Sequence, residues 1–153
     1  HKLPQFLIIF LFLLLLIQII FGAFLAGLDG GLIYNTWPDM NGLFFPDDIS
    51  IFNIVFNDIV SVPSLIQFVH RKIAYLIFIL ILYFNYTYFK NKLPFMPIMI
   101  FNLSVIFQIF LGIITLLSGA KIIYASLHQI GSIFVVSSFL YIAYRNSKLT
   151  NSF

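Results

Sequence analysis

The 153-residue sequence contains no cysteine and few charged residues: 8% of its residues are charged and 61% are hydrophobic. The lack of cysteine excludes disulfides, iron–sulfur clusters and thiolate-bound metals. A soluble domain averages about 25% charged residues, so this composition cannot cover a water-exposed surface with polar groups. The small net charge of +3 comes without a clustered basic face, which argues against nucleic-acid binding. The composition predicts a membrane protein.

The apolar residues are grouped in stretches that are long enough for transmembrane helices, which need about 20 residues. Four such stretches occur, at residues 4–28, 64–89, 95–117 and 122–144. An outer connection over residues 29–63 separates the first two. The predicted fold class is an all-α membrane protein, a four-transmembrane-helix bundle that forms a single domain over residues 1–153.

The charged residues divide between the two ends of the predicted bundle. One end receives most of the basic residues, namely Lys2, Lys90, Lys92, Arg145 and Lys148. The other end receives every acidic residue, namely Asp29, Asp39, Asp47, Asp48 and Asp58. Because basic residues favour the cytoplasmic side of a membrane, we expect both termini in the cytoplasm or the equivalent compartment.

An internal repeat relates the two halves of the chain. The segment QIIFGAFLAG begins at Gln18, and QIFLGIITLLSG begins at Gln108. Both read glutamine, three apolar residues, glycine and then a second glycine near the outer end. Each of the helices that follow carries one histidine. We interpret the bundle as two helical hairpins that arose by duplication, each a glutamine/glycine helix followed by a histidine helix.

The small and amide residues of the repeat have structural explanations. Small residues spaced four apart let helix backbones approach closely in lipid. We expect such packing from Gly22/Ala26 and Ala23/Gly27. The side chains of Gln18 and Gln108 need partners inside the membrane. We favour interhelical hydrogen bonds for them over contacts to a cofactor.

Two histidines lie inside apolar runs, His70 in QFVHRKIAY and His128 in ASLHQIGS. Ionisable residues are costly there and are functional candidates by default. His70 lies seven residues after Pro63, and His128 lies seven residues after Lys121. At a helical rise of 1.5 Å per residue, both imidazoles lie about 10 Å below the same boundary. Equal depth on two helices of one bundle is what a shared ligand requires.

The ligand that suits two imidazoles is haem, because its iron accepts axial ligands on both faces and helix bundles commonly hold such cofactors in their interior. Ala74, Ala125 and Gly131 lie near the histidines and leave room for a macrocycle. Zinc needs three or four ligands, and no further membrane-embedded ligand is available. We favour haem ligation shared by His70 and His128 over two separate polar contacts with carbonyls or glutamines.

Arg71 follows His70 at the level where haem propionates would emerge, and a guanidinium pairs well with carboxylates. Contact with lipid headgroups is an equal alternative for Arg71, and snorkelling is the interpretation for Lys72 and Lys121. In the outer connection, an aromatic belt at the membrane interface is expected from Tyr34, Trp37, Phe44 and Phe45. Residues 49–60 suit an amphipathic helix on the outer face. We favour a simple interfacial segment there over a lid.

Three blocks of the sequence resemble a known family. GAFLAGLDGGLIYNTWPDMNG, QFVHRKIAY and LGIITLL…ASLHQIGS resemble the C-terminal half of haem A synthase, in its alphaproteobacterial and mitochondrial form. The resemblance covers nearly the whole chain, and the order of the blocks makes it specific. It places the chain in the bacterial inner membrane or the mitochondrial inner membrane, as a multi-pass protein.

The resemblance implies an eight-helix enzyme built from two four-helix bundles, each with a histidine pair. The C-terminal pair, which His70 and His128 match, would ligate a haem b that transfers electrons. The N-terminal bundle would receive the substrate haem O. The enzyme oxidises a methyl group of haem O to the formyl group of haem A, which serves the terminal oxidase.

The sequence departs from this family because the N-terminal bundle and the family's catalytic glutamate are missing, and the chain contains no glutamate at all. The catalytic residues are therefore unknown. We expect a fragment, a remnant or a split-gene product that does not turn over haem O alone. A separate N-terminal half or a homo-oligomer are the candidate protein partners, with membrane lipid around them. The alternatives are a bis-histidine cytochrome b-type electron-transfer or oxidase-assembly subunit, and a haem-free assembly subunit.

Overall fold

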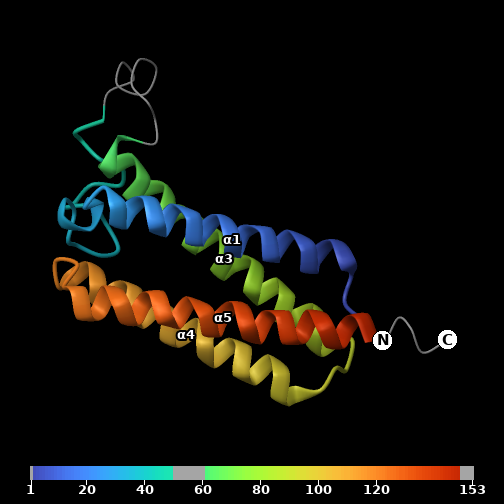
Figure 1. The fold of residues 1–153 in the computed structure, drawn as a ribbon. Coiled ribbons are helices and arrows are strands. Elements are labelled where there is room, and N and C mark those ends of the chain that lie inside the picture. Colours follow the sequence, from blue (N-terminus) through green and yellow to red (C-terminus); the bar gives the residue numbers. More distant parts are fainter. Residues whose placement is uncertain (1, 50–60, 149–153) are drawn as a thin grey trace.

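The computed structural model describes residues 2–49 and 61–148, and four long helices dominate it (Figure 1). They are α1 (Gln5–Gly27), α3 (Pro63–Lys90), α4 (Phe95–Leu117) and α5 (Ile122–Lys148), and a 3-10 helix η1 (Gly30–Leu32) follows α1. Each long helix is apolar and long enough to cross a membrane. Within the described residues there is no strand. The predicted all-α, four-helix membrane bundle is confirmed.

Prolines mark the starts of three helices. Pro63 is the first residue of α3, while Pro4 and Pro94 directly precede α1 and α4. The first N–H groups of a helix have no intrahelical partner, so a proline there loses no hydrogen bond. Between α4 and α5 the chain reverses through Gly119 and Ala120, both with positive φ (70° and 53°). This tight turn explains the glycine two residues after the apolar run ends at Leu117.

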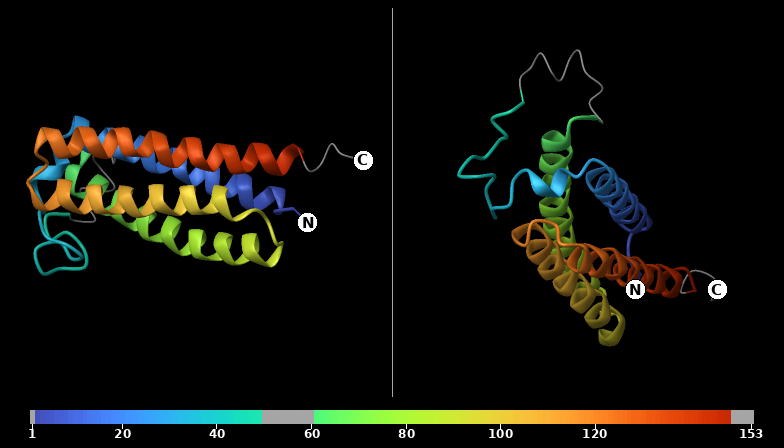
Figure 2. Two further views of the ribbon diagram at one scale, coloured as in Figure 1. Left: turned by 90° about the horizontal axis from the view of Figure 1, so that it is seen from below. Right: turned by 60° about the vertical axis from the view of Figure 1, so that its left-hand side comes forward.

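Both termini lie at one end of the bundle, which we call the terminal end, and the connection after α1 lies at the opposite, outer end (Figures 1 and 2). The side chain of Asn146 joins the termini: its Oδ1 accepts from the Leu3 N–H at 2.7 Å, and its Nδ2 donates to the Leu3 carbonyl at 3.2 Å. Helix α1 packs mainly against α3, and α4 packs mainly against α5. The helices therefore associate as two neighbouring pairs.

The apolar core lies toward the terminal end. Phe84, Phe101 and Phe139, from three different helices, are fully buried, and their ring centroids are 5.5 to 6.1 Å apart. The last buried residue of α1 is Leu15, and the first large buried residue of α5 is Val135. Close packing of large side chains thus covers roughly the half of the bundle that lies away from the two histidines.

A pair of amides joins α3 to α4 within this apolar region. Asn85 Nδ2 donates to Asn102 Oδ1 at 3.1 Å, and Asn102 Nδ2 donates to Asn85 Oδ1 at 2.8 Å. Each amide supplies a hydrogen-bond donor and an acceptor to the other, which removes most of the free-energy cost of placing amides in lipid. The two bonds fix the register between these helices.

Candidate functional site

The first part of the outer connection, residues 29–49, lies against the outer ends of α3 and α4. Asn35 Nδ2 donates to the carbonyl of Gly31 at 2.7 Å and to that of Leu116, at the end of α4, at 3.0 Å. A Cβ added to Gly31 would lie 2.9 Å from Cβ of Ala120, so only glycine allows this approach to the α4–α5 turn. Residues 50–60, which include most of the predicted amphipathic helix, lie outside the described residues.

Arg71 holds the outer connection onto α3. Its Nη1 donates to the carbonyls of Thr36 and Asp39 at 2.9 and 2.7 Å, and its Nη2 donates to that of Tyr34 at 2.8 Å. Gln67, one turn earlier on α3 and only 1% exposed, donates to the same Tyr34 carbonyl at 3.0 Å. Arg71 is 9% exposed, because the outer connection covers its guanidinium, and its contact with lipid headgroups stays a prediction. Its pairing with a haem propionate stays a prediction.

Tyr34 is a second anchor of the connection, and its predicted place in an interfacial aromatic belt is wrong. It is 4% exposed, and its hydroxyl donates to Oδ1 of Asp47 at 2.6 Å and to Oδ1 of Asp48 at 2.9 Å. Burial, followed by these two hydrogen bonds, raises the pKa of Tyr34 to about 12. The Ser64 hydroxyl, at the start of α3, also donates to Asp48. Tyr34 therefore joins the connection to α3.

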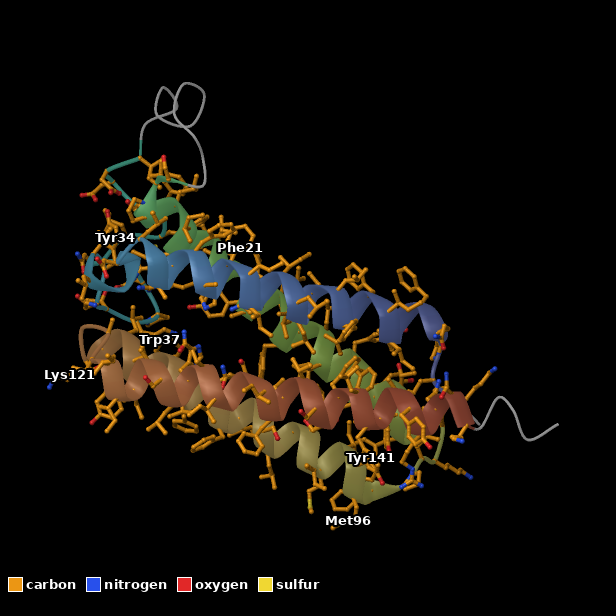
Figure 3. All side chains as sticks on the ribbon, viewed as in Figure 1. Phe21, Tyr34, Trp37, Met96, Lys121 and Tyr141 are labelled. Carbon is orange, nitrogen blue, oxygen red and sulfur yellow. The ribbon has the colours of Figure 1, made fainter. Side chains whose placement is uncertain are left out.

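Lysines and aromatic rings complete this end of the molecule (Figure 3). The Nζ of Lys72 lies 3.8 Å from the ring centroid of Phe44 and 4.9 Å from that of Phe68, which is the geometry of a cation–π contact. Lys72 thus has an aromatic partner that the snorkelling interpretation did not include. Lys121 and Trp37 lie at the same end and are exposed.

His70 contacts α1 at both residues of the repeat motif. Its Nε2 lies 3.2 Å from Nε2 of Gln18, and a Cβ on Gly22 would lie 3.2 Å from its Cε1. The amide of Gln18 can donate to an unprotonated Nε2. Gly22 therefore makes room for an imidazole, whereas the sequence pattern indicated contact between helix backbones. Among the described residues, a Cβ on Gly27 would meet nothing within 4 Å, so the close packing predicted there is not found in this part of the chain.

His128 likewise contacts the glycine and the glutamine of the motif on α4. A Cβ on Gly112 would lie 2.9 Å from Cε1 of the His128 ring, and Gln108 Nε2 donates to the His128 carbonyl at 2.9 Å. The interhelical hydrogen bonds predicted for Gln18 and Gln108 are confirmed. The sequence signal for the ring contacts was the spacing of four between each glutamine and its glycine, which places both on one helix face.

The two halves differ in where the glutamine points. Gln108 reaches the backbone of α5 because Gly131 leaves space: a Cβ there would lie 2.2 Å from Oε1 of Gln108. At the equivalent position of α3, three residues after His70, the chain has Ile73. A branched side chain there leaves no such space, and Gln18 bonds the imidazole of His70 instead.

The two imidazoles form a pair of candidate ligands. They come from α3 and α5, and each lies against a glycine of the long helix that precedes it in the chain. In each ring, Nδ1 is buried and has no hydrogen-bond partner within residues 2–49 and 61–148. No group of three histidine, aspartate or glutamate side chains comes together in the same part of the chain. The fold and site define a membrane helix bundle with two partly buried histidines.

The chain belongs to the family described as cytochrome oxidase assembly protein (COX15-CtaA), which it matches over residues 1–140. It is 52% identical over 147 residues to a heme A synthase of Pelagibacter ubique, and this match covers 96% of the chain and 44% of that relative. It is 42% identical over 139 residues to a heme A synthase of Wolbachia pipientis, covering 91% of the chain and 39% of the relative.

A heme A synthase of Rickettsia bellii is 38% identical over 138 residues, which are 89% of the chain and 41% of the relative. The chain thus spans less than half the length of the curated relatives that it matches. No solved structure matches it. The resemblance stated from the sequence blocks is confirmed at the level of the family.

Proposed function

We propose that the chain is the haem b-binding half of a haem A synthase, with His70 and His128 as axial ligands of the iron. The observation that carries this proposal is the pair of imidazoles, each against a glycine and each with a buried Nδ1 that lacks a partner among the described residues. A buried, unpartnered polar atom costs free energy. Two neutral imidazoles are also a donor set that haem iron accepts on its two faces.

The residues around the histidines fit a bound haem. Haem b would supply one-electron transfer at this site. Gly22 and Gly112 give the two rings their space. Iron ligation by Nε2 of His70 would replace the hydrogen bond that Gln18 makes to this atom. Arg71 keeps its buried Nε without a partner in the described part of the chain, so it has a free donor for a haem propionate. The outer connection, held by Arg71, would cover this end.

We further propose that oxidation of the haem O methyl group to the formyl group of haem A takes place in a second, N-terminal half of the enzyme. The relatives that share this chain's sequence are heme A synthases more than twice as long as the matched region, and the chain has no glutamate that could serve as the family's catalytic residue. Linked sequence or a separate subunit would supply that half. The charge asymmetry of the sequence supports a cytoplasmic terminal end in a bacterial inner membrane.

The test is spectroscopic. The chain is expressed with haem available, purified in detergent, and examined by reduced-minus-oxidised difference spectra. We expect a b-type signal that is lost in His70→Ala and in His128→Ala and kept in His1→Ala, which removes the third histidine of the chain. Circular dichroism and size-exclusion profiles show that the variants remain folded. A featureless spectrum of the intact chain, or a signal that persists without both histidines, would contradict the assignment.

A second candidate is a bis-histidine cytochrome b-type subunit that transfers electrons or supports oxidase assembly without acting on haem O. The described residues favour it in one respect, because they hold a single histidine pair. Neighbouring coding sequence with four more spans, a second histidine pair and a membrane-level glutamate would favour the synthase. Production of haem A on co-expression with such a half, read by chromatography of extracted haems, would decide between the two. A haem-free assembly subunit would give no b-type spectrum.

A further inference from the structure

A polar pocket lies at the terminal end of the bundle, opposite the histidines. The turn between α3 and α4 and the last turns of α5 enclose about 510 Å³. Three basic side chains line it, namely Lys92, Arg145 and Lys148. The rest of the lining includes the buried, apolar side chains of Leu3 and Ile142. The pocket thus combines positive charge at its rim with an apolar floor.

Within residues 2–49 and 61–148, no acidic side chain neutralises the positive charge of this pocket. The four described acids, Asp29, Asp39, Asp47 and Asp48, belong to the outer connection, and the described part of that connection lies at the other end of the bundle (Figure 1). Arg145 and Lys148 are exposed and lie near aromatic rings, 5.9 Å from the Tyr141 centroid and 5.5 Å from the Tyr144 centroid. A soluble or lipid anion would therefore meet three uncompensated cations.

The depth of the pocket points to lipid as the source of the anion. Lys92 lies two residues after α3 ends, and Lys148 is the last residue of α5. The ends of transmembrane helices lie at the level of lipid headgroups. Basic pockets between transmembrane helices at this level bind anionic headgroups, and a lipid can also place the start of its acyl chains against an apolar floor. A free phosphate ion would gain nothing from Leu3 and Ile142.

We propose that this pocket binds the phosphate group of an anionic phospholipid in the leaflet that the termini face, with Lys92, Arg145 and Lys148 as its cationic ligands. The proposal does not depend on haem or on the proposed enzymatic function. The experiment is native mass spectrometry of the full chain released from detergent, with palmitoyl-oleoyl phosphatidylglycerol or palmitoyl-oleoyl phosphatidylcholine added at equal concentrations.

We expect the intact chain to retain phosphatidylglycerol in preference to phosphatidylcholine. Loss of one pocket cation, in Lys92→Gln or Arg145→Gln, should lower the amount of retained phosphatidylglycerol about fivefold, the effect of losing one hydrogen bond to the phosphate. The matched control is Lys90→Gln. Lys90 lies at the same end of the bundle and is exposed, but it does not line the pocket. This variant should stay within about twofold of the intact chain, because a screened surface charge contributes little.

Two outcomes would overturn the proposal. Equal retention of the two lipids would show that the pocket does not select a negative charge. An equal loss in Lys90→Gln and in the pocket variants would show a general surface effect. A further arm adds inorganic phosphate, which should not displace phosphatidylglycerol at equal concentration; displacement would show a soluble-anion site instead of a lipid site.

Discussion

Gly112 and His128 are in direct contact across α4 and α5: a Cβ on the glycine would lie 2.9 Å from Cε1 of the imidazole. Gly22 and His70 repeat the arrangement on α1 and α3 at 3.2 Å. In both halves of the bundle, a glycine that follows a glutamine by four residues faces the histidine of the next long helix. Because glycine has no side chain, Gly22 and Gly112 leave the space in which the two imidazole rings lie.

The first prediction concerns these glycines. Gly112→Ala should lower the free energy of unfolding by about 1–3 kcal/mol, since an added methyl would have to displace the imidazole ring of His128. Gly22→Ala should cost less, because its Cβ has more space. Thermal unfolding in detergent measures both effects. The control is Gly27→Ala, because no described residue lies within 4 Å of an added Cβ there and because alanine improves helix propensity. Equal stability of Gly112→Ala and Gly27→Ala would refute the packing argument.

The second prediction concerns the clamp on the outer connection. Arg71→Lys keeps the positive charge but cannot reach the carbonyls of Tyr34, Thr36 and Asp39 together, because an ammonium lacks the planar fork of a guanidinium. We expect amide hydrogens of residues 34–42 to exchange at least about tenfold faster, which corresponds to loss of one charged hydrogen bond. Lys72→Arg serves as the control, since Lys72 contacts only rings. Unchanged exchange in Arg71→Lys would show that the connection is held by other contacts.

The third prediction is a pH dependence at Tyr34. Its pKa is raised from 10.0 to about 12, so the folded connection favours the protonated hydroxyl. The resulting stabilisation is complete below pH 10 and disappears as the pH rises toward about 12. The fluorescence of Trp37, the only tryptophan of the chain, reports on this segment. We expect an alkaline transition of Trp37 in the intact chain and an altered signal already at neutral pH in Tyr34→Phe.

Tyr83→Phe is the control for that titration, because Tyr83 is exposed on α3 and lies outside the outer connection. It should leave the Trp37 transition where it is. If Tyr34→Phe also left the transition unchanged, the network that joins Tyr34 to Asp47 and Asp48 would not hold the connection in place.

The fourth prediction concerns the amide pair between α3 and α4. Asn85→Leu and Asn102→Leu should each destabilise the bundle, and a double-mutant cycle should give a coupling of about 0.6 kcal/mol, with about 1.7 as the upper end for membrane helices. Ser104→Ala provides the uncoupled reference, because Ser104 bonds only the Ile100 carbonyl of its own helix. A coupling of zero between Asn85 and Asn102 would mean that the pair does not fix the helix register.

The sequence predicted the four helices well because their apolar runs are long and because prolines and glycines mark several of their ends. The predicted stretch at 95–117 matches α4 (Phe95–Leu117), and the fourth helix extends beyond 144 to Lys148. The extra turn carries Arg145, Asn146 and Lys148, which hydropathy alone assigns to water. The Asn146 bonds to Leu3 explain why the helix continues there.

Contacts between elements were harder to predict, because spacing along a helix shows which residues share a face but not what that face meets. Gly22 fits a backbone-packing motif and a ring contact equally well from sequence. Gln67 and Arg71 share a face of α3, yet their common partner, the Tyr34 carbonyl, belongs to a connection with no periodic pattern. Tyr34 was assigned to the interface for the same reason: its aspartate partners become visible only once the chain is folded.

The unequal distribution of the core has a consequence for the order of assembly. Since Phe84, Phe101 and Phe139 already fill the terminal end, the four spans can associate there on insertion into the bilayer. The end that carries the histidines has fewer large buried side chains, so it would become ordered later. The bundle would then assemble from its terminal end toward its outer end.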